Sequence, residues 1–219
     1  VTDERAVAAA YGADLVIACD GLNSGIRARY ADAFRPDVEN RRCRFVWLGT
    51  KKRFDAFTFA FEETEHGWFQ AHIYQFDGDT STFIVETPED VWQKAGLDRM
   101  SQQEGIRFCE RLFATQLDGH PLLSNAAHLR GSAIWIRFPR IVCGNWVHRI
   151  DVDGKAVPLV LMGDAAHTAH YSIGSGTKLA LEDAIELARC FAMHGAEGMD
   201  KVLAVYQDKG LLDPTGAGI

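Results

Sequence analysis

Two short runs of apolar residues stand near opposite ends of this chain, and each run leads to an aspartate beside a glycine. The first lies in ADLVIACDG, residues 13–21, and the second in VPLVLMGDA, residues 157–165. Continuous apolar runs of this length are typical of parallel strands that are buried on both faces. We therefore expect Asp20 and Asp164 at the carboxyl ends of strands, where open α/β sheets bind ligands.

The chain between these runs has a different pattern, in which aromatic and β-branched residues are interspersed with polar ones. Such a pattern predicts an antiparallel sheet with one solvated face. The expected strands cover residues 44–48, 56–62, 67–76 and 81–86, and SAIWIRFPRIVC at 132–143 resumes the same character. Ser101 and Glu104 have the spacing of a capping box, which predicts a helix over residues 101–115.

The order of these patterns predicts the domain organisation. A segment of α/β character is followed by an antiparallel insert, after which the α/β character returns. We expect an α/β fold with an α+β insert, in which residues 1–42 and 149–208 form one lobe and residues 43–148 form a second. Residues 209–219 have the composition of an irregular tail.

A helix is predicted from Thr177 onward, directly after the second aspartate. Apolar and small residues at helical spacing predict the face that packs on a core, namely Thr177, Ala180, Leu181, Ala184, Ala188 and Phe191. Gly174 and Gly176 precede this helix, so a ligand can approach its first N–H groups closely. The helix dipole favours a negative or electron-rich group at this position.

Asp164 beside this terminus is suited to accept hydrogen bonds from hydroxyl groups. A polyol chain that leads to an electron-rich ring describes a flavin. A glycine-rich turn before a helix also occurs in ordinary strand-turn-helix packing, and both interpretations remain open at this point.

Charge and composition exclude several classes of protein. The formal net charge is -7, with 30 acidic and 23 basic residues and no long basic run, which argues against a nucleic-acid partner. No apolar stretch approaches the roughly 20 residues of a membrane span, and the first residues lack the order of a signal peptide. The five cysteines are scattered and form no C-x-x-C pair, which favours a reducing, cytoplasmic compartment.

Two motifs in the chain resemble those of the aromatic-ring flavoprotein monooxygenases, the p-hydroxybenzoate hydroxylase family. GDAAH followed by GSGTKLALEDAIELA resembles the family's second flavin-binding motif, and ADLVIACDGLNSGIR resembles its Asp-Gly motif. The resemblance implies a partial FAD-binding, three-layer Rossmann-like lobe with an inserted antiparallel-sheet substrate lobe. Within the family, the sequence is most similar to hydroxylases that act on coenzyme A thioesters of salicylate or 2-aminobenzoate.

The resemblance also implies roles for particular residues. Asp164 accepts hydrogen bonds from the ribityl chain of FAD, and the backbones of Gly176, Thr177 and Lys178 face the flavin ring, where charge accumulates on reduction. Asp20 and Arg27 shape the groove along the pyrophosphate. The matching motif positions complete the set of cofactor-binding residues with Gly21, Gly163, Ala165 and Gly174.

The chain departs from many relatives at His170 and Tyr171, where they have a proline pair. We expect these two residues to act in catalysis, with His170 bonding the peroxide or a ring hydroxyl, although a satisfied loop histidine is the competing interpretation. The implied reaction uses FAD, NAD(P)H and dioxygen to hydroxylate an electron-rich aromatic ring through a C4a-hydroperoxyflavin. Strand aromatics such as Trp68, Tyr74 and Trp135 are either pocket or core residues.

The sequence also offers other interpretations. His167 and His170 have the spacing of half a metal site, but they lack a third ligand at suitable spacing, so no metal is expected. The family's G-x-G-x-x-G fingerprint is expected upstream of Val1, which favours an internal piece of a monooxygenase. The alternative function is therefore a non-catalytic fragment that acts as a binding module. A hydrolase using Asp164 and His167 lacks a nucleophile turn.

Overall fold

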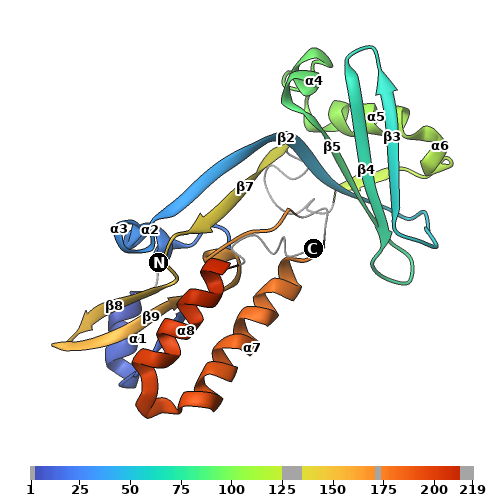
Figure 1. The fold of residues 1–219 in the computed structure, drawn as a ribbon. Helices are drawn as coiled ribbons and strands as arrows, with labels where there is room; N and C mark the ends of the chain where they lie inside the picture. Colours follow the sequence, from blue (N-terminus) through green and yellow to red (C-terminus); the bar gives the residue numbers. More distant parts are fainter. Residues whose placement is uncertain (1–2, 125–134, 171–173, 213–219) are drawn as a thin grey trace. The chain divides into compact units, whose positions relative to one another are not determined.

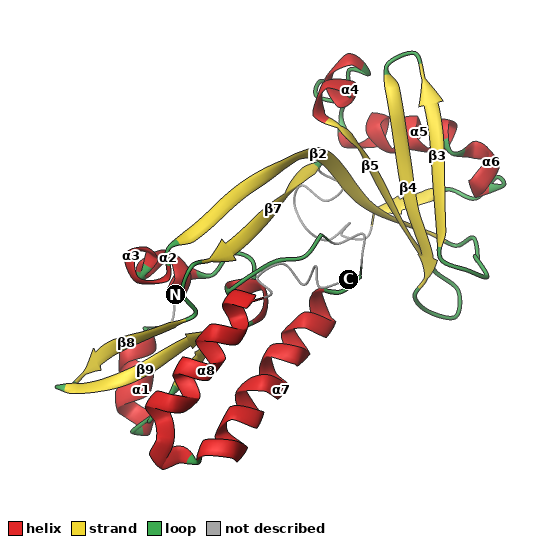
Figure 2. Cartoon of the chain, in the orientation of Figure 1, coloured by secondary structure: helices red, strands yellow, loops and turns green. Residues whose placement is uncertain are grey.

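The computed structural model describes residues 3–124, 135–170 and 174–212. The chain divides into two compact units. The first unit comprises residues 1–39 and 139–219, and the second unit comprises residues 40–138. Both units mix helices and strands, as the predicted α/β fold class requires (Figures 1 and 2).

The first unit is built on a sheet of three strands in the order β1-β9-β8. Strand β1 (Val16–Ala18) runs parallel to β9 (Lys155–Leu161), and β8 (Val147–Val152) runs antiparallel to β9. Asp153 and Gly154 connect β8 to β9 with φ angles of 52° and 82°. Two successive left-handed residues are typical of a tight hairpin turn, and Asp-Gly is a favoured pair there.

The helices of the first unit come from both ends of the chain. They are α1 (Glu4–Tyr11), α2 (Gly25–Arg29), α3 (Ala31–Phe34), α7 (Gly176–His194) and α8 (Met199–Leu212), with the short 3-10 turns η1 (Gly163–Ala165) and η3 (Ala196–Gly198). Helices α7 and α8 are connected by η3 and lie side by side, and α1 packs against β8 (Figure 1). Their apolar side chains share one core with β9, whose last five residues are all buried.

Two burial predictions for this unit were wrong. The buried residues of α7 are Leu187 and Cys190, whereas Leu181, expected on the packed face, is 59% exposed. Helical periodicity locates an apolar stripe, but tertiary packing decides which part of a wide stripe is covered. In β1, Ile17 is 44% exposed although the strand was expected to be buried on both faces. Among the described strands β1 pairs with β9 alone and is therefore an edge strand.

The second unit contains an antiparallel sheet in the order β3-β4-β5-β2-β6, with β7 paired to β2. The strands are β2 (Pro36–Thr50), β3 (Thr58–Thr64), β4 (Gly67–Gln75), β5 (Ser81–Pro88), β6 (Leu122–Ser124) and β7 (Ile136–Cys143). The helices α4 (Glu89–Lys94), α5 (Gln102–Leu112) and α6 (Ala114–Leu117) belong to the same unit. The capping box at Ser101 begins α5, as predicted.

One face of this sheet forms the core of the second unit. Alternate residues of β4 (Phe69, Ala71 and Ile73) pack with Phe83 and with side chains of the helices. The other residues of each strand point to the opposite face, because successive side chains of a strand alternate.

The boundaries of the two units differ from the predicted ones. The insert was expected to end at residue 148, but the second unit ends at Phe138, within β7. The hairpin of β8 and β9 was not predicted. Strand β9 is central in the sheet and has a continuous apolar run, whereas β8 lies at the edge and mixes polar and apolar residues, so the two strands do not share one hydrophobic pattern. Helix α8 continues to Leu212, past the expected start of an irregular tail at residue 209.

Candidate active site

The loop after β1 is folded by its own motif residues. Gly21 has a φ angle of 76°, a left-handed conformation that favours glycine. The carboxylate of Asp20 accepts a hydrogen bond from the backbone N–H of Ile26 at 3.1 Å, and Ser24 Oγ accepts one from Arg27 N at 2.9 Å. These contacts start α2.

Arg27 joins the two motifs that were noted separately in the sequence. Its side chain is buried, with 7% exposure, and Nη1 donates to the carbonyl oxygens of Ala165 at 2.9 Å and Asp164 at 3.3 Å. Its Nη2 donates to the carbonyl oxygen of Leu22 at 2.6 Å. The guanidinium therefore ties the loop after β1 to the turn after β9, across 138 residues of sequence.

The turn after β9 presents Asp164 at the surface of the first unit. Gly163 has a φ angle of 61°, and a Cβ atom there would lie 3.1 Å from Cβ of Ala180 on α7. Glycine thus allows the turn to approach the helix closely. Ala165 is fully buried, whereas the side chain of Asp164 is exposed and has no side-chain partner among the described residues.

The start of α7 is open on its amino side. Gly174 has a φ angle of 66°, and a Cβ atom on Gly174 or Gly176 would meet no atom of the described part of the chain within 4 Å. Ser175 makes no side-chain cap, and within the described residues no acceptor contacts the backbone N–H groups of Gly176, Thr177 or Lys178. This terminus has the free donors and the positive dipole end that an electron-rich group requires.

The side chain of Lys178 points toward another partner. Its Nζ lies 2.8 Å from Oε1 of Glu182, one turn further along α7, and both side chains are largely exposed. Such a pair contributes little to stability. The backbone of Lys178, rather than its ammonium group, is the part available at the helix terminus.

Asp183 contacts the turn with Asp164, and the sequence patterns did not single it out. Its Oδ2 accepts a hydrogen bond from the N–H of Gly163 at 2.8 Å and lies 2.9 Å from Nε2 of His167. His167 is buried and its ring stacks on Trp146, with 4.6 Å between centroids. Its spacing in the sequence could have indicated this position, because Asp183 lies four residues before Leu187 and seven before Cys190, which are both buried on α7.

Cys19 lies near the same charges. Burial, followed by the negative charges of Asp20 and Asp183, raises the pKa of its thiol. The thiol stays protonated near neutral pH, since the thiolate would add a third negative charge.

The structure describes only one of the two residues that were expected to act in catalysis. His170 is half-buried at the end of the segment that follows His167. Tyr171 lies outside the described residues. Among the residues that the structure describes, no group of three or more His, Cys, Asp or Glu side chains could hold a metal ion.

The second unit carries a polar cluster on the face of its sheet that is opposite the core. Gln70 Nε2 donates to Oε2 of Glu86 at 2.8 Å and lies 3.1 Å from Nε2 of His72, while His72 Nε2 and Glu86 Oε2 are 3.4 Å apart. His72 and Glu86 are 2% and 5% exposed. The ring of Phe59 packs edge-on against His72, with 4.8 Å between centroids.

Aromatic side chains surround this cluster in the register of the sheet. Phe61 pairs with Gln70 across β3 and β4, and Phe45 pairs with Glu86 across β2 and β5. Phe61 and Trp68 are 57% and 53% exposed, so this face presents a large aromatic surface. A buried polar cluster within such a surface is suited to recognise a ring that bears a polar substituent.

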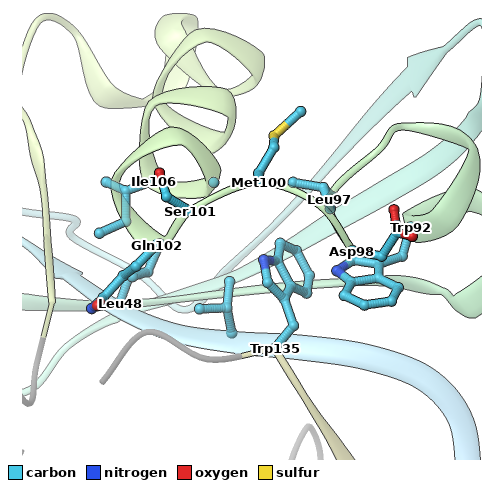
Figure 3. A pocket seen from close by; sticks show the side chains of 11 residues that line it. Leu48, Trp92, Leu97, Asp98, Met100, Ser101, Gln102, Ile106 and Trp135 are labelled. Carbon is cyan, nitrogen blue, oxygen red and sulfur yellow. The ribbon is translucent and has the colours of Figure 1, made fainter. Parts of the chain in front are cut away.

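A pocket of about 270 Å³ lies elsewhere in the second unit, between β2, α4 and the beginning of α5 (Figure 3). Trp92 and Trp135 contribute indole rings to it, and Leu48 and Ile106 contribute aliphatic walls. Arg44 places its guanidinium 4.7 Å from the centroid of the Trp92 ring. The pocket is predominantly apolar and contains Trp135, one of the aromatic residues considered for a substrate pocket.

Fold and site together place an open helix terminus beside a turn with an exposed carboxylate. Residues 145–215 match the FAD binding domain family. These residues contain β9, the turn with Asp164 and the whole of α7. No helix in residues 3–124, 135–170 and 174–212 is long and apolar enough to cross a membrane.

Similar proteins extend this result. Salicyloyl-CoA 5-hydroxylase of a Streptomyces species is 39% identical over 204 residues, which cover 90% of this chain and 37% of that protein. 3-Hydroxy-4-methyl-anthranilyl-(aryl-carrier protein) 5-monooxygenase of Streptosporangium sibiricum is 38% identical over 175 residues, covering 80% of this chain and 42% of that protein. The chain therefore spans about two fifths of the length of these relatives.

A solved structure shows the same fold. HpxO of Klebsiella pneumoniae, crystallised with FAD and uric acid, has a TM-score of 0.58 and 21% identity, covering 90% of this chain and 46% of that chain. The chain is thus similar over most of its length to FAD-dependent aromatic monooxygenases, which confirms the resemblance expected from the two motifs.

Proposed function

We propose that this chain forms the ribityl- and ring-binding part of the FAD site, together with the substrate-facing sheet, of an aromatic hydroxylase. One observation carries the proposal: Arg27 binds the carbonyls of Asp164 and Ala165, so the two family motifs are assembled at one place. The close packing of Gly163 on Ala180 holds that turn against α7, whose first N–H groups are open.

The residues present fit the cofactor. Asp164 has an exposed carboxylate that can accept hydrogen bonds from the ribityl hydroxyls. Open space beside Gly174 and Gly176 lets a flat ring approach the helix terminus, since no side chain of the described residues fills it. The N–H groups of Gly176, Thr177 and Lys178 would then stabilise negative charge on that ring.

Bound FAD supplies the redox and oxygen chemistry that amino-acid side chains lack. The protein's own contribution is to orient the cofactor and the aromatic substrate and to exclude water. His170 and Tyr171 are the proposed catalytic residues at the oxygen-binding edge of the ring, and Asp20, Gly21 and Arg27 complete the cofactor side. NAD(P)H is the proposed reductant.

The proposed substrate is an electron-rich aromatic ring held as a thioester. Two of the similar proteins are named for aromatic acyl groups attached to coenzyme A or to an aryl-carrier protein. In this chain, the aromatic face around His72 and Glu86 offers both ring contacts and a polar group for a ring hydroxyl or amine. The five cysteines are free thiols, which is consistent with a reducing cytoplasm.

The test is an equilibrium titration of FAD, followed by flavin fluorescence, on this chain and on a form extended to the length of its relatives. Asp164→Ala is expected to weaken FAD binding by about tenfold or more, because charge-assisted hydrogen bonds to the ribityl chain are lost. Asp208→Ala, which truncates an exposed acid on α8 in the same way, is the matched control. Unchanged affinity in Asp164→Ala would exclude its ribityl role.

The same titration distinguishes a hydroxylase from the alternative function, a non-catalytic binding module. If neither form binds FAD, the chain is not a flavin-binding unit, and a binding module that retains the fold is favoured instead. If FAD binds and an aromatic thioester stimulates NAD(P)H oxidation with formation of a hydroxylated product, the module alternative is rejected.

A further inference from the structure

Asp183 occupies a position where the helical pattern calls for an apolar residue. It precedes the buried Leu187 by four residues and the buried Cys190 by seven, so all three lie on the inward side of α7. Its side chain is only 10% exposed. A carboxylate in such a position is costly unless specific donors satisfy it.

One oxygen of Asp183 receives both of the contacts described for it. Oδ2 accepts the N–H of Gly163 at 2.8 Å and lies 2.9 Å from Nε2 of His167. Gly163 begins the η1 turn, and His167 lies two residues beyond the end of that turn. A single atom on α7 therefore holds the turn at its first residue and just beyond its last.

The contact with His167 also selects a tautomer. Nε2 donates to the carboxylate, which leaves Nδ1 of the neutral ring without a hydrogen. Nδ1 is buried and has no partner among the described residues. Asp183 thus holds the His167 ring in one orientation against Trp146.

We propose that Asp183 is a positioning residue of the flavin site. It fixes the direction in which the turn presents Asp164, and it sets the distance between that turn and the open terminus of α7. This inference rests on the proposed function, because it assigns Asp183 a task toward the same cofactor. Asp183 does not itself reach the ligand, and it acts through Gly163 and His167.

Two substitutions separate this role from a general structural one. Asp183→Ala removes the acceptor, whereas Asp183→Asn keeps an oxygen that can occupy the place of Oδ2 and accept from both donors. Asp208→Asn makes the same chemical change at an exposed site of α8. All three are compared with the parent chain.

The first readout is amide hydrogen exchange without FAD. In Asp183→Ala the exchange of the Gly163 amide should accelerate by about tenfold or more, since a part-buried hydrogen bond is lost. Amides in the middle of β9 should change far less. A purely structural role would instead raise exchange throughout the first unit, and Asp183→Asn should restore protection at Gly163 to within about threefold of the parent.

The second readout is FAD affinity in the form extended to the length of the relatives. Asp183→Ala should lose about tenfold in affinity, and Asp183→Asn should recover most of it. The inference is overturned if the parent binds FAD while Asp183→Ala matches Asp208→Asn in both measurements, or if exchange rises uniformly across the unit. Failure of the parent and the control to bind FAD would instead refute the proposed function itself.

Discussion

Replacement of Arg27 by methionine tests whether the two family motifs are held together by one side chain. Methionine retains most of the aliphatic volume of arginine but cannot donate hydrogen bonds. The change removes bonds of 2.6 Å to Leu22 O and 2.9 Å to Ala165 O, and a longer one of 3.3 Å to Asp164 O. The first two have the geometry of full-strength bonds.

The expected magnitude follows from these contacts. Hydrogen bonds to charged groups contribute about 1.5–3 kcal/mol each, and the cost of burying the guanidinium offsets part of that gain. Ala165 is fully buried, so its carbonyl loses its strongest donor, whereas water can reach the half-buried Leu22. We expect Arg27→Met to lower the free energy of unfolding by about 2–4 kcal/mol.

Hydrogen exchange by mass spectrometry is the appropriate assay, because it resolves individual segments of a chain with two units. The largest change should occur in peptides that contain residues 20–28 and 160–168. Arg189→Met, which removes an exposed guanidinium of α7 paired with Glu186 at 3.5 Å, is the control and should change stability by less than about 0.5 kcal/mol. Indistinguishable exchange in the two variants would refute the assigned role of Arg27.

Two further predictions follow from the first unit. Gly163→Ala should destabilise the turn by about 1–3 kcal/mol, because its φ is 61° and the new Cβ would lie 3.1 Å from Cβ of Ala180; thermal unfolding measures this, and an unchanged midpoint would contradict it. Glu4 is buried, and although desolvation alone raises its pKa, hydrogen bonds from Tyr30 and Arg29 hold the pKa below its ordinary value of 4.5. A lowered folded pKa means that the ionised form stabilises the fold, so this contribution is present above about pH 4.5 and is lost on further acidification. Urea unfolding of the parent and of Glu4→Gln should therefore differ at about pH 7 and converge toward about pH 3, and a constant difference would refute the argument.

Local sequence patterns were sufficient to identify much of the fold. The apolar run of β9, the strands of the insert, the capping box at Ser101 and the helix after Gly176 were all predicted, since each depends on short-range periodicity or on residues within a few positions. The two motifs also indicated the proteins that the chain resembles, because glycine and aspartate at such turns meet local backbone requirements that the sequence displays directly.

Contacts between distant residues were beyond the reach of such patterns. The sequence marked Arg27 and Asp164 separately, but only the folded chain shows that the guanidinium binds the carbonyls of the turn. In the sequence Asp183 is one acid among several on α7. Its proposed role depends on the N–H of Gly163, which donates a hydrogen bond to it from 20 residues away. The cluster of His72 and Glu86 likewise exists only through strand register.

The physical reason for this division is that secondary structure follows from periodicity along the chain, whereas burial and hydrogen-bond partners depend on which surfaces meet. Leu181 shows the difference, because its spacing marks an apolar face of α7 while the packed face runs through Leu187 and Cys190. The sequence alone indicated the family resemblance, most of the elements and the residues at the turns. Tertiary structure decided which side chains hold those turns together and which apolar positions are covered.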